Sequence, residues 1–277
     1  MHIPVSVIIP CYCCSETIER AVNSVMAQTM LPAELWLVDD ASPDEGRTLN
    51  KLHELKEQYS HLLHIEVIAL PKNGGPSVAR NAGWEKATQP YIAFLDADDS
   101  WHPRKLEIQY GWMKEHPETY LTGHRCLWLK VDAYPHIPMQ ENGQFYVKRV
   151  TPFSLLLSNR FSTRSVILKR DLPFRFDPLK RYSEDYLLWL QIALSGYKCC
   201  LLELPLAYLF KAPYGESGLS GDLWSMERGQ LDTFYRLYKE GYISGLVWAF
   251  LILFSVAKFC RRIVLVGARR IAEEIKK

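Results

Sequence analysis

Residues 91–99 read YIAFLDADD, an apolar run that ends in three carboxylates within four positions. The run is short, contains aromatic and β-branched side chains, and is too apolar to leave one face in water. It therefore predicts a strand that is buried on both faces, as in a parallel sheet. Three earlier runs have the same character and cover residues 5–10, 34–39 and 64–70.

Helical patterns lie between these runs, because apolar residues recur there every three or four positions. The stripes are Ile18, Ala21, Val22, Val25 and Met26, then Leu49, Leu52 and Leu55, then Val78, Ala82 and Ala87. We expect the second helix to start at residues 42–44, where Ser42 can cap it and Pro43 fits its first turn. This alternation predicts an α/β fold with right-handed crossovers and a doubly wound, mostly parallel sheet flanked by helices.

The second half of the chain is less regular. We expect helices at residues 103–116 and 184–195, strands at residues 120–131 and 165–169, and a further apolar run at residues 201–210. Residues 131–143 and 211–222 have the Gly, Pro and polar content that is typical of surface loops. Residues 223–277 are predicted to form a helical appendage to a main domain at residues 1–222.

The composition is that of an ordinary globular protein of 277 residues, with 48% hydrophobic residues and a net charge of +2. So small a basic excess disfavours a protein that coats nucleic-acid phosphates, and the apolar content excludes disorder. The seven cysteines are an odd number in apolar surroundings, which indicates reduced thiols rather than a disulfide framework or a zinc site. The first residues form no signal peptide, so we expect a cytoplasmic protein.

Polar groups follow each of the four predicted parallel strands. Open α/β sheets bind ligands outside the carboxyl ends of their strands, so these groups should meet at one edge. They are Pro10, Cys11 and Tyr12 after the first strand, Asp39 and Asp40 after the second, Asn73, Gly74, Gly75 and Arg80 after the third, and Asp96, Asp98 and Asp99 after the fourth.

The acidic triplet predicts a divalent cation site. Three carboxylates at a strand end repel one another, and a hard cation relieves that repulsion. Mg²⁺ or Mn²⁺ prefers carboxylate oxygens and keeps positions open for phosphate oxygens. The alternative is that Asp98 and Asp99 only cap the next helix, with Pro103 in its first turn.

The other candidates also have two interpretations each. Asp39 and Asp40 are either a solvated pair or hydrogen-bond partners of a nucleobase or ribose. The Asn73–Gly75 stretch is either a plain turn or a close backbone approach to a phosphate or sugar near a helix N-terminus, with Arg80 adding charge. Glu184 and Asp185 either favour a helix N-terminus by their charge or include a catalytic base.

Several nucleotide-binding and hydrolase motifs are missing. No G-x-G-x-x-G follows the first strand, no G-K-[ST] occurs, and no G-x-S-x-G is present. These absences disfavour a nicotinamide-binding domain, a P-loop NTPase and an α/β-hydrolase, respectively.

The motif series resembles that of family 2 glycosyltransferases, which have the GT-A fold. The matching stretches are VSVIIPCY at residues 5–12, LVDDAS at 37–42, NGGPSVARNAG at 73–83, FLDADD at 94–99 and SED at 183–185. The resemblance covers residues 3–210 and implies an inverting transfer from a nucleotide-diphospho-sugar, commonly a UDP-sugar, with Mn²⁺ or Mg²⁺.

The resemblance also implies roles for single residues. Asp39 would bind the base, Arg80 would contact the nucleotide, Asp96 would lie by the ribose, Asp98 would hold the metal with Asp96 in support, and Asp185 would be the catalytic base. Pro10, Tyr12, Asn73 and Gly74 would complete the donor site. Lys211, on a loop that closes over the donor, would lie near the phosphates.

Two departures and two alternatives accompany this resemblance. Cys13 and Cys14 replace the polar residues usual after the first strand, and the Gln/Arg-x-x-Arg-Trp motif of processive synthases is missing, which favours transfer of a single sugar. A sugar-phosphate nucleotidyltransferase would need a Gly-rich loop after the first strand, and residues 11–15 have none. A non-catalytic nucleotide-sugar binding protein would not need Asp96, Asp98 and Asp185.

The C-terminal segment is the outlier in composition. Residues 246–257 are apolar except for Ser255, and Lys258, Arg261 and Arg262 follow, so the stretch is shorter than the ~20 residues that span a bilayer. We expect a helix that lies in a membrane interface with Arg269 and Arg270 near anionic head groups, while an oligomer contact or a core helix are the alternatives. A lipid-linked acceptor at the inner face of the cytoplasmic membrane, in cell-surface glycan assembly, would match it.

Overall fold

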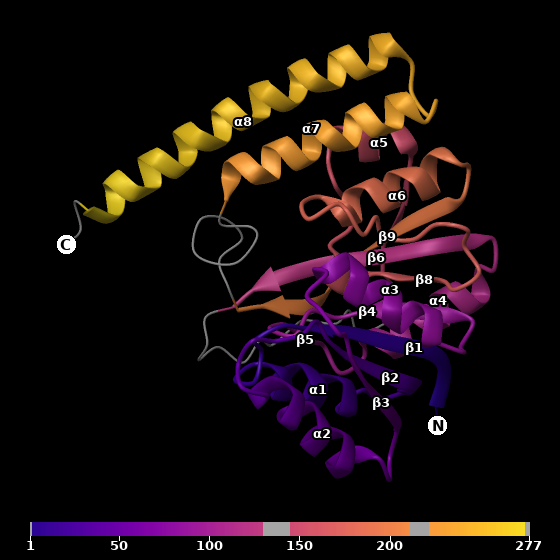
Figure 1. Cartoon of the computed structure of the whole chain (residues 1–277). Coiled ribbons are helices and arrows are strands. Elements are labelled where there is room, and N and C mark those ends of the chain that lie inside the picture. Colours follow the sequence, from indigo (N-terminus) through magenta and orange to yellow (C-terminus); the bar gives the residue numbers. More distant parts are fainter. Residues whose placement is uncertain (1, 130–144, 211–221, 275–277) are drawn as a thin grey trace.

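The computed structural model describes residues 2–129, 145–210 and 222–274. In these residues nine strands form one mixed sheet in the order β3-β2-β1-β4-β8-β6-β9-β5, and β7 also pairs with β9 (Figure 1). Helices cover both faces of the sheet. The predicted fold class, an α/β sheet flanked by helices, is confirmed, and the sheet is mixed rather than mostly parallel, since four of its eight strand pairings are antiparallel.

The first half of the sheet is parallel. It consists of β1 (His2–Cys11), β2 (Leu31–Asp39), β3 (His64–Ala69) and β4 (Tyr91–Phe94). Neighbouring β1 residues pack into opposite cores, since Val7 and Ile9 lie in one cluster and Ile8 lies in the other. Both faces of the strand are therefore buried, as its unbroken apolar sequence predicted.

The helices divide between the two faces. α1 (Ile18–Met26), α2 (Arg47–Tyr59) and α4 (Lys105–Glu115) share one core cluster, and α3 (Pro76–Lys86) shares the other with α6 (Glu184–Leu194). One expected helix cap is wrong, and so is one alternative that the sequence left open. Ser42 does not cap α2, because its hydroxyl donates to Asp39, and Asp44 accepts the Thr48 amide instead. Asp98 and Asp99 do not cap a helix, because strand β5 (Ser100–Trp101) follows them and α4 begins only after Pro103.

Antiparallel strand pairing appears in the second half of the sheet. The strand β8 (Ile167–Lys169) runs antiparallel between β4 and β6 (Thr119–Trp128), and β9 (Lys198–Leu209) pairs parallel with β6. Four short elements were not predicted from the sequence, namely β5, β7 (Val147–Val150), α5 (Pro152–Leu157) and the 3₁₀ turn η1 (Thr163–Ser165). The loop expected at residues 131–143, and all but the last residue of the loop expected at 211–222, lie outside the described residues.

Two C-terminal helices, α7 (Leu223–Lys239) and α8 (Gly245–Glu274), lie side by side as the outermost layer (Figure 1). Phe234 and Leu237 of α7 and Leu251 of α8 belong to the same core cluster as α6. The division of the chain at residue 222 stays a prediction. Among the residues that were placed, no helix is long and apolar enough to cross a membrane.

The fold also contains a buried lysine, Lys105, at the start of α4. The Lys105 side chain is fully buried, with Nζ 3.7 Å from the centroid of the Trp101 ring, and it has no hydrogen-bond partner among the described residues. Burial lowers the pKa of Lys105 well below its ordinary value of 10.5. The nearby His124 is also buried, and burial together with Lys105 lowers its pKa to about 3.

We predict that Lys105→Met stabilises the protein at pH 7 by about 1–3 kcal/mol, because an unpaired buried amine is replaced by an apolar chain of similar length. The folded protein releases the Lys105 proton at a lower pH than the unfolded chain does, so this lysine makes stability rise with pH toward 10.5. The gain from methionine should therefore shrink as the pH rises. Urea unfolding of both proteins between pH 7 and pH 10 measures it, and a gain that is independent of pH contradicts the prediction.

Candidate active site

The segments that follow the parallel strands meet at one edge of the sheet, as predicted. Backbone hydrogen bonds join them in pairs. The Asp40 amide donates to the Cys11 carbonyl at 2.8 Å, and the Leu70 amide donates to the Asp39 carbonyl at 2.9 Å. These bonds extend the ladders of β1, β2 and β3 past the ends of the strands and bring their polar residues together.

Asp40 organises the turn before α3. Its carboxylate accepts the amides of Gly74 and Gly75 at 2.8 and 2.7 Å, and it also accepts the Asn73 side-chain amide at 3.0 Å. Burial raises the pKa of Asp40, although the two glycine amides oppose the shift. The Gly74 amide thus donates its hydrogen bond to Asp40, whereas the sequence predicted that this backbone approaches a phosphate or sugar. The role of Asn73 and Gly74 at the donor stays a prediction.

Asp39 shapes the segment after β1. It is buried and accepts the Ser42 hydroxyl at 2.6 Å, and that hydroxyl accepts the Cys13 amide at 2.9 Å. Cys13 has a φ of 47°, in the left-handed region that costs a side chain energy and occurs often at functional sites. This segment, which carries Pro10 and Tyr12, is therefore fixed by Asp39, and the Tyr12 side chain is exposed.

Arg80 of α3 is the centre of the site. Its guanidinium is buried and donates to Asp96 at 2.9 Å and to Glu184 at 3.0 Å. The arginine thus joins the acidic segment after β4 to the start of α6, two regions far apart in the sequence. These bonds commit both terminal nitrogens to carboxylates, and the expected contact of Arg80 with a nucleotide stays a prediction.

Two further arginines surround the acidic triplet. Arg164 forms ion pairs with Asp99 and, at 3.3 Å, with Asp96, and Arg20 donates to the Asp98 carbonyl at 2.6 Å. Burial alone would raise the pKa of Asp96, but Arg164 and Arg80 outweigh it and lower that pKa. Burial raises the pKa of Asp99 to about 8. Arginines therefore supply part of the positive charge near these carboxylates, while Asp96 and Asp98 still raise the pKa of Asp99. The expected divalent cation stays a prediction.

The residues still suit a cation that is shared with a ligand. Within the described parts of the chain, no three His, Cys, Asp or Glu side chains are grouped so that they could hold a metal. Mg²⁺ commonly binds one or two carboxylates together with substrate phosphates, so a set as small as Asp98 and Asp96 fits it. Asp98 is partly exposed, whereas Asp99 is buried. Of these two adjacent carboxylates, Asp98 is therefore the better placed to bind a cation that is shared with a ligand.

Asp185 and Glu184 have different hydrogen-bond partners. The Glu184 carboxylate is buried against Arg80, whereas Asp185 is partly exposed. Asp185 accepts the Thr163 hydroxyl at 3.1 Å and the Tyr186 amide at 2.6 Å. Burial raises the pKa of the Asp185 carboxyl above its ordinary range, and Arg80 opposes the shift. A partly exposed carboxylate with a raised pKa is suited to accept a proton from a ligand.

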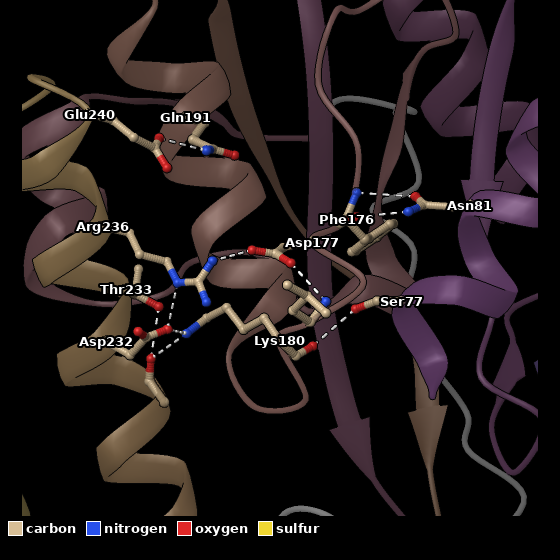
Figure 2. Close-up of polar contacts among 12 residues, drawn as sticks. Ser77, Asn81, Phe176, Asp177, Lys180, Gln191, Asp232, Thr233, Arg236 and Glu240 are labelled. Atoms are coloured by element: carbon tan, nitrogen blue, oxygen red, sulfur yellow. Dashed lines mark hydrogen bonds and ion pairs between the residues drawn. The ribbon is translucent and has the colours of Figure 1, made fainter. Parts of the chain in front are cut away.

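The segment that leads to Asp185 is tied to α3. Asn81 forms two hydrogen bonds with the backbone of Phe176, one from its amide nitrogen at 2.7 Å and one to its amide oxygen at 3.1 Å (Figure 2). The Ser77 hydroxyl donates to the Lys180 carbonyl at 3.2 Å. Ser183 follows with a φ of 56° and starts α6. The helix that carries Arg80 therefore also positions the approach to the candidate base.

The same segment is tied to α7 by ion pairs. The Lys180 side chain is buried and pairs with Asp232 at 2.7 Å, and Arg236 pairs with both Asp232 and Asp177 (Figure 2). A side chain at Gly229 would clash with the backbone of Tyr182, whose carbonyl oxygen is 2.7 Å from the Cβ position. α7 therefore packs tightly on the residues just before Asp185.

Some functional candidates were missed from the sequence. Arg164 and Arg20 belong to no recognisable motif, and their partners lie 65 and 78 positions away, so no local signal identified them. Glu184 was considered only as the neighbour of Asp185, and its tie to Arg80 was not predicted. Lys211, expected near the phosphates, lies outside the described residues.

Comparison with known proteins identifies the family of this chain. The profile described as Glycosyl transferase family 2 matches residues 6–178. The chain belongs to glycosyl transferase family 2. It is 33% identical over 192 residues to the UDP-Glc:alpha-D-GlcNAc-diphosphoundecaprenol beta-1,3-glucosyltransferase WfgD of Escherichia coli, covering 68% of this chain and 69% of WfgD. It is 29% identical over 191 residues to the amylovoran biosynthesis glycosyltransferase AmsE of Erwinia amylovora, covering 66% of each.

The fold of this family 2 chain is also that of solved glycosyltransferases. The mannosyltransferase PcManGT from Pyrobaculum calidifontis, in complex with GDP-Man and Mn²⁺, superposes with a TM-score of 0.64 at 18% identity. The superposition covers 98% of this chain and 81% of PcManGT. The likeness confirms the GT-A fold that the motif series implied.

Proposed function

We propose that this family 2 glycosyltransferase moves a single sugar, with inversion, from a UDP-sugar to a hydroxyl acceptor. The observation that carries the proposal is the Arg80 bridge, which holds the acidic segment with Asp96 and Asp98 opposite the helix that begins with Glu184 and Asp185. In this proposal, the donor site and the base lie on two sides of one buried guanidinium. WfgD, whose name specifies UDP-Glc, supports the choice of a uridine donor.

The chemistry follows from the placement of the carboxylates. Asp185 accepts the proton of the acceptor hydroxyl while that oxygen forms its bond to the anomeric carbon. The bond from the anomeric carbon to the diphosphate breaks on the opposite face, so the configuration inverts and UDP leaves with the electron pair. A Mn²⁺ or Mg²⁺ ion held by Asp98, with Asp96 in support, would offset the negative charge that grows on the diphosphate.

The acceptor is proposed to be lipid-linked, as in cell-surface glycan assembly at the inner face of the cytoplasmic membrane. The outer face of α8, formed by Leu246, Phe250, Leu253 and Val256, is apolar and exposed, and Leu246 is 87% exposed. Leu251 and Phe259 point into the protein instead, so the apolar residues of α8 divide between two faces. Basic residues follow along the helix, and such a helix binds anionic membrane surfaces. A second copy of the chain is the alternative occupant of this face.

Asp185→Asn is predicted to lower kcat by about 10²–10⁴-fold with little change in the KM for the UDP-sugar, because it removes a positioned base and leaves the donor side intact. In the wild type, kcat should rise with pH through the raised pKa of Asp185, since only the ionised form accepts the proton. Transfer from a panel of UDP-sugars to hydroxyl acceptors, with the anomeric configuration of the product read by NMR, tests the function. A product that retains the donor configuration, or a fully active Asp185→Asn, contradicts it.

Asp98→Asn is predicted to raise the concentration of Mn²⁺ needed for half-maximal donor binding by about 10-fold or more, since it deletes a charge and little volume. Titration of UDP binding by calorimetry at several Mn²⁺ concentrations measures the effect. The matched control is Asp44→Asn on the loop before α2, which should leave the Mn²⁺ requirement unchanged. Undiminished UDP binding in excess chelator would falsify the metal assignment.

The substitutions Leu246→Gln, Phe250→Gln and Leu253→Gln together are predicted to reduce cosedimentation with vesicles of phosphatidylcholine and 30% phosphatidylglycerol by about 10-fold. These side chains are exposed, so the fold should survive, as the melting temperature will show. A control with Leu62→Gln and Leu179→Gln removes exposed apolar groups elsewhere and should bind as the wild type does. If the wild-type protein does not bind these vesicles, the membrane contact is wrong.

A further inference from the structure

A three-residue 3₁₀ turn, η1 (Thr163–Ser165), touches both halves of the proposed site. The Thr163 hydroxyl donates to Asp185 Oδ2 at 3.1 Å. The next residue, Arg164, pairs through its guanidinium with Asp99 and with Asp96 Oδ2 at 3.3 Å. Neighbouring residues of one short turn therefore hold the candidate base and the acidic segment of the donor side.

The turn itself is held rigidly by buried donors. The Trp101 indole donates to the Arg164 carbonyl at 2.7 Å, and the Gln109 amide donates to the Ser165 carbonyl at 2.9 Å. The Ser165 hydroxyl donates to the Ser162 carbonyl at 2.7 Å. Trp101 belongs to β5 and Gln109 belongs to α4, so two elements on one side fix the turn that faces the site on the other.

The geometry points to η1 as the positioning element of the reaction: Thr163 orients the Asp185 carboxylate, and Arg164 holds the Asp96–Asp99 segment at a fixed separation from it. This inference rests on the proposed function, because it assigns the two contacts to its base and to its donor side. Neither residue is a catalytic residue, since each acts through a carboxylate.

Within the described residues, the Asp185 carboxylate has one protein donor on each oxygen, because the Tyr186 amide donates to Oδ1 at 2.6 Å and Thr163 donates to Oδ2. Two donors on two oxygens fix the rotation of the carboxylate plane. The loss of the hydroxyl would leave Oδ2 free to rotate away from an acceptor. It would also destabilise the ionised form, because a hydrogen bond to a carboxylate favours its charge.

Besides Asp185 itself, no charged side chain in the described part of the chain is hydrogen-bonded to the Thr163 hydroxyl. Arg80 approaches from α3 and Asp96 from the segment after β4, and both act on the pKa of Asp185. Glu184 is the neighbour on α6, and Arg160 acts on the adjacent Tyr186 phenol. A substitution that removes the Thr163 hydroxyl therefore removes its hydrogen bond to Asp185 without deleting any of these charges.

The test compares Thr163→Val with Thr163→Ser in the full-length protein with the UDP-sugar and acceptor that the wild type uses. Thr163→Val should lower kcat about 10-fold, leave the donor KM unchanged and move the acidic limb of the kcat–pH profile upward by about half to one pH unit. Thr163→Ser keeps the hydroxyl and should restore both values. Thr233→Val, which removes another buried threonine hydroxyl on α7, is the matched control and should leave the profile unchanged.

Arg164→Lys tests the other half of the turn. Lysine keeps the charge but cannot reach two carboxylates as a fork, so the donor KM should rise about fivefold or more while the acidic limb stays in place. The inference is overturned if Thr163→Val leaves both kcat and the pH limb unchanged, or if Thr163→Ser fails to rescue a defect of the valine variant. If the wild type transfers no sugar at all, the proposed function fails instead, so the two failures are distinguishable.

Discussion

The bridge that Arg80 makes between Asp96 and Glu184 is the interaction on which the site depends. Its guanidinium and the Glu184 carboxylate are buried, and ions so far from water cost several kcal/mol each unless they are paired. Removal of the arginine would leave two carboxylates without their shared partner. The bridge is therefore less a source of stability than a constraint, because it allows only one relative placement of the donor segment and α6.

The Arg80 bridge in turn depends on how α3 is held. Asp40 binds the turn before that helix through two glycine amides, and Asn81 and Ser77 on the helix bind the segment that leads to Asp185. The buried arginine thus stands on a helix that is fixed at its start and along its length. Asp40 was expected to be a ligand contact or a solvated side chain, and the structure gives it this third role.

Sequence patterns predicted the strands and their polar ends because both signals are local. The buried run at residues 91–95 and the carboxylates after it lie within a few positions of one another. The charge that Arg164 brings to those carboxylates could not be predicted, because Arg164 pairs with Asp99 from 65 positions away. Arg20 donates to the Asp98 backbone carbonyl from 78 positions away, which is equally non-local. The predicted start of α2 was wrong for a related reason, since the Ser42 hydroxyl donates to Asp39 in the site instead of capping the helix. Periodicity and capping rules consider only neighbouring residues, so they do not predict when a distant residue takes a side chain as its hydrogen-bond partner.

The C-terminal helices share the rigid frame of the site. Ser255 of α8 is buried, donates to Glu227 of α7 at 2.6 Å and accepts from Gln230 at 2.9 Å. α7 packs through Gly229 on Tyr182 and holds Lys180 by its ion pair with Asp232, which fixes the chain just before Asp185. The outer face of α8 is thus joined to Asp185 by packed and hydrogen-bonded residues rather than by a free linker. Whatever covers that face is held at one set distance and orientation from the carboxylate, and such a fixed geometry is what a transferase needs if its acceptor is anchored to a surface.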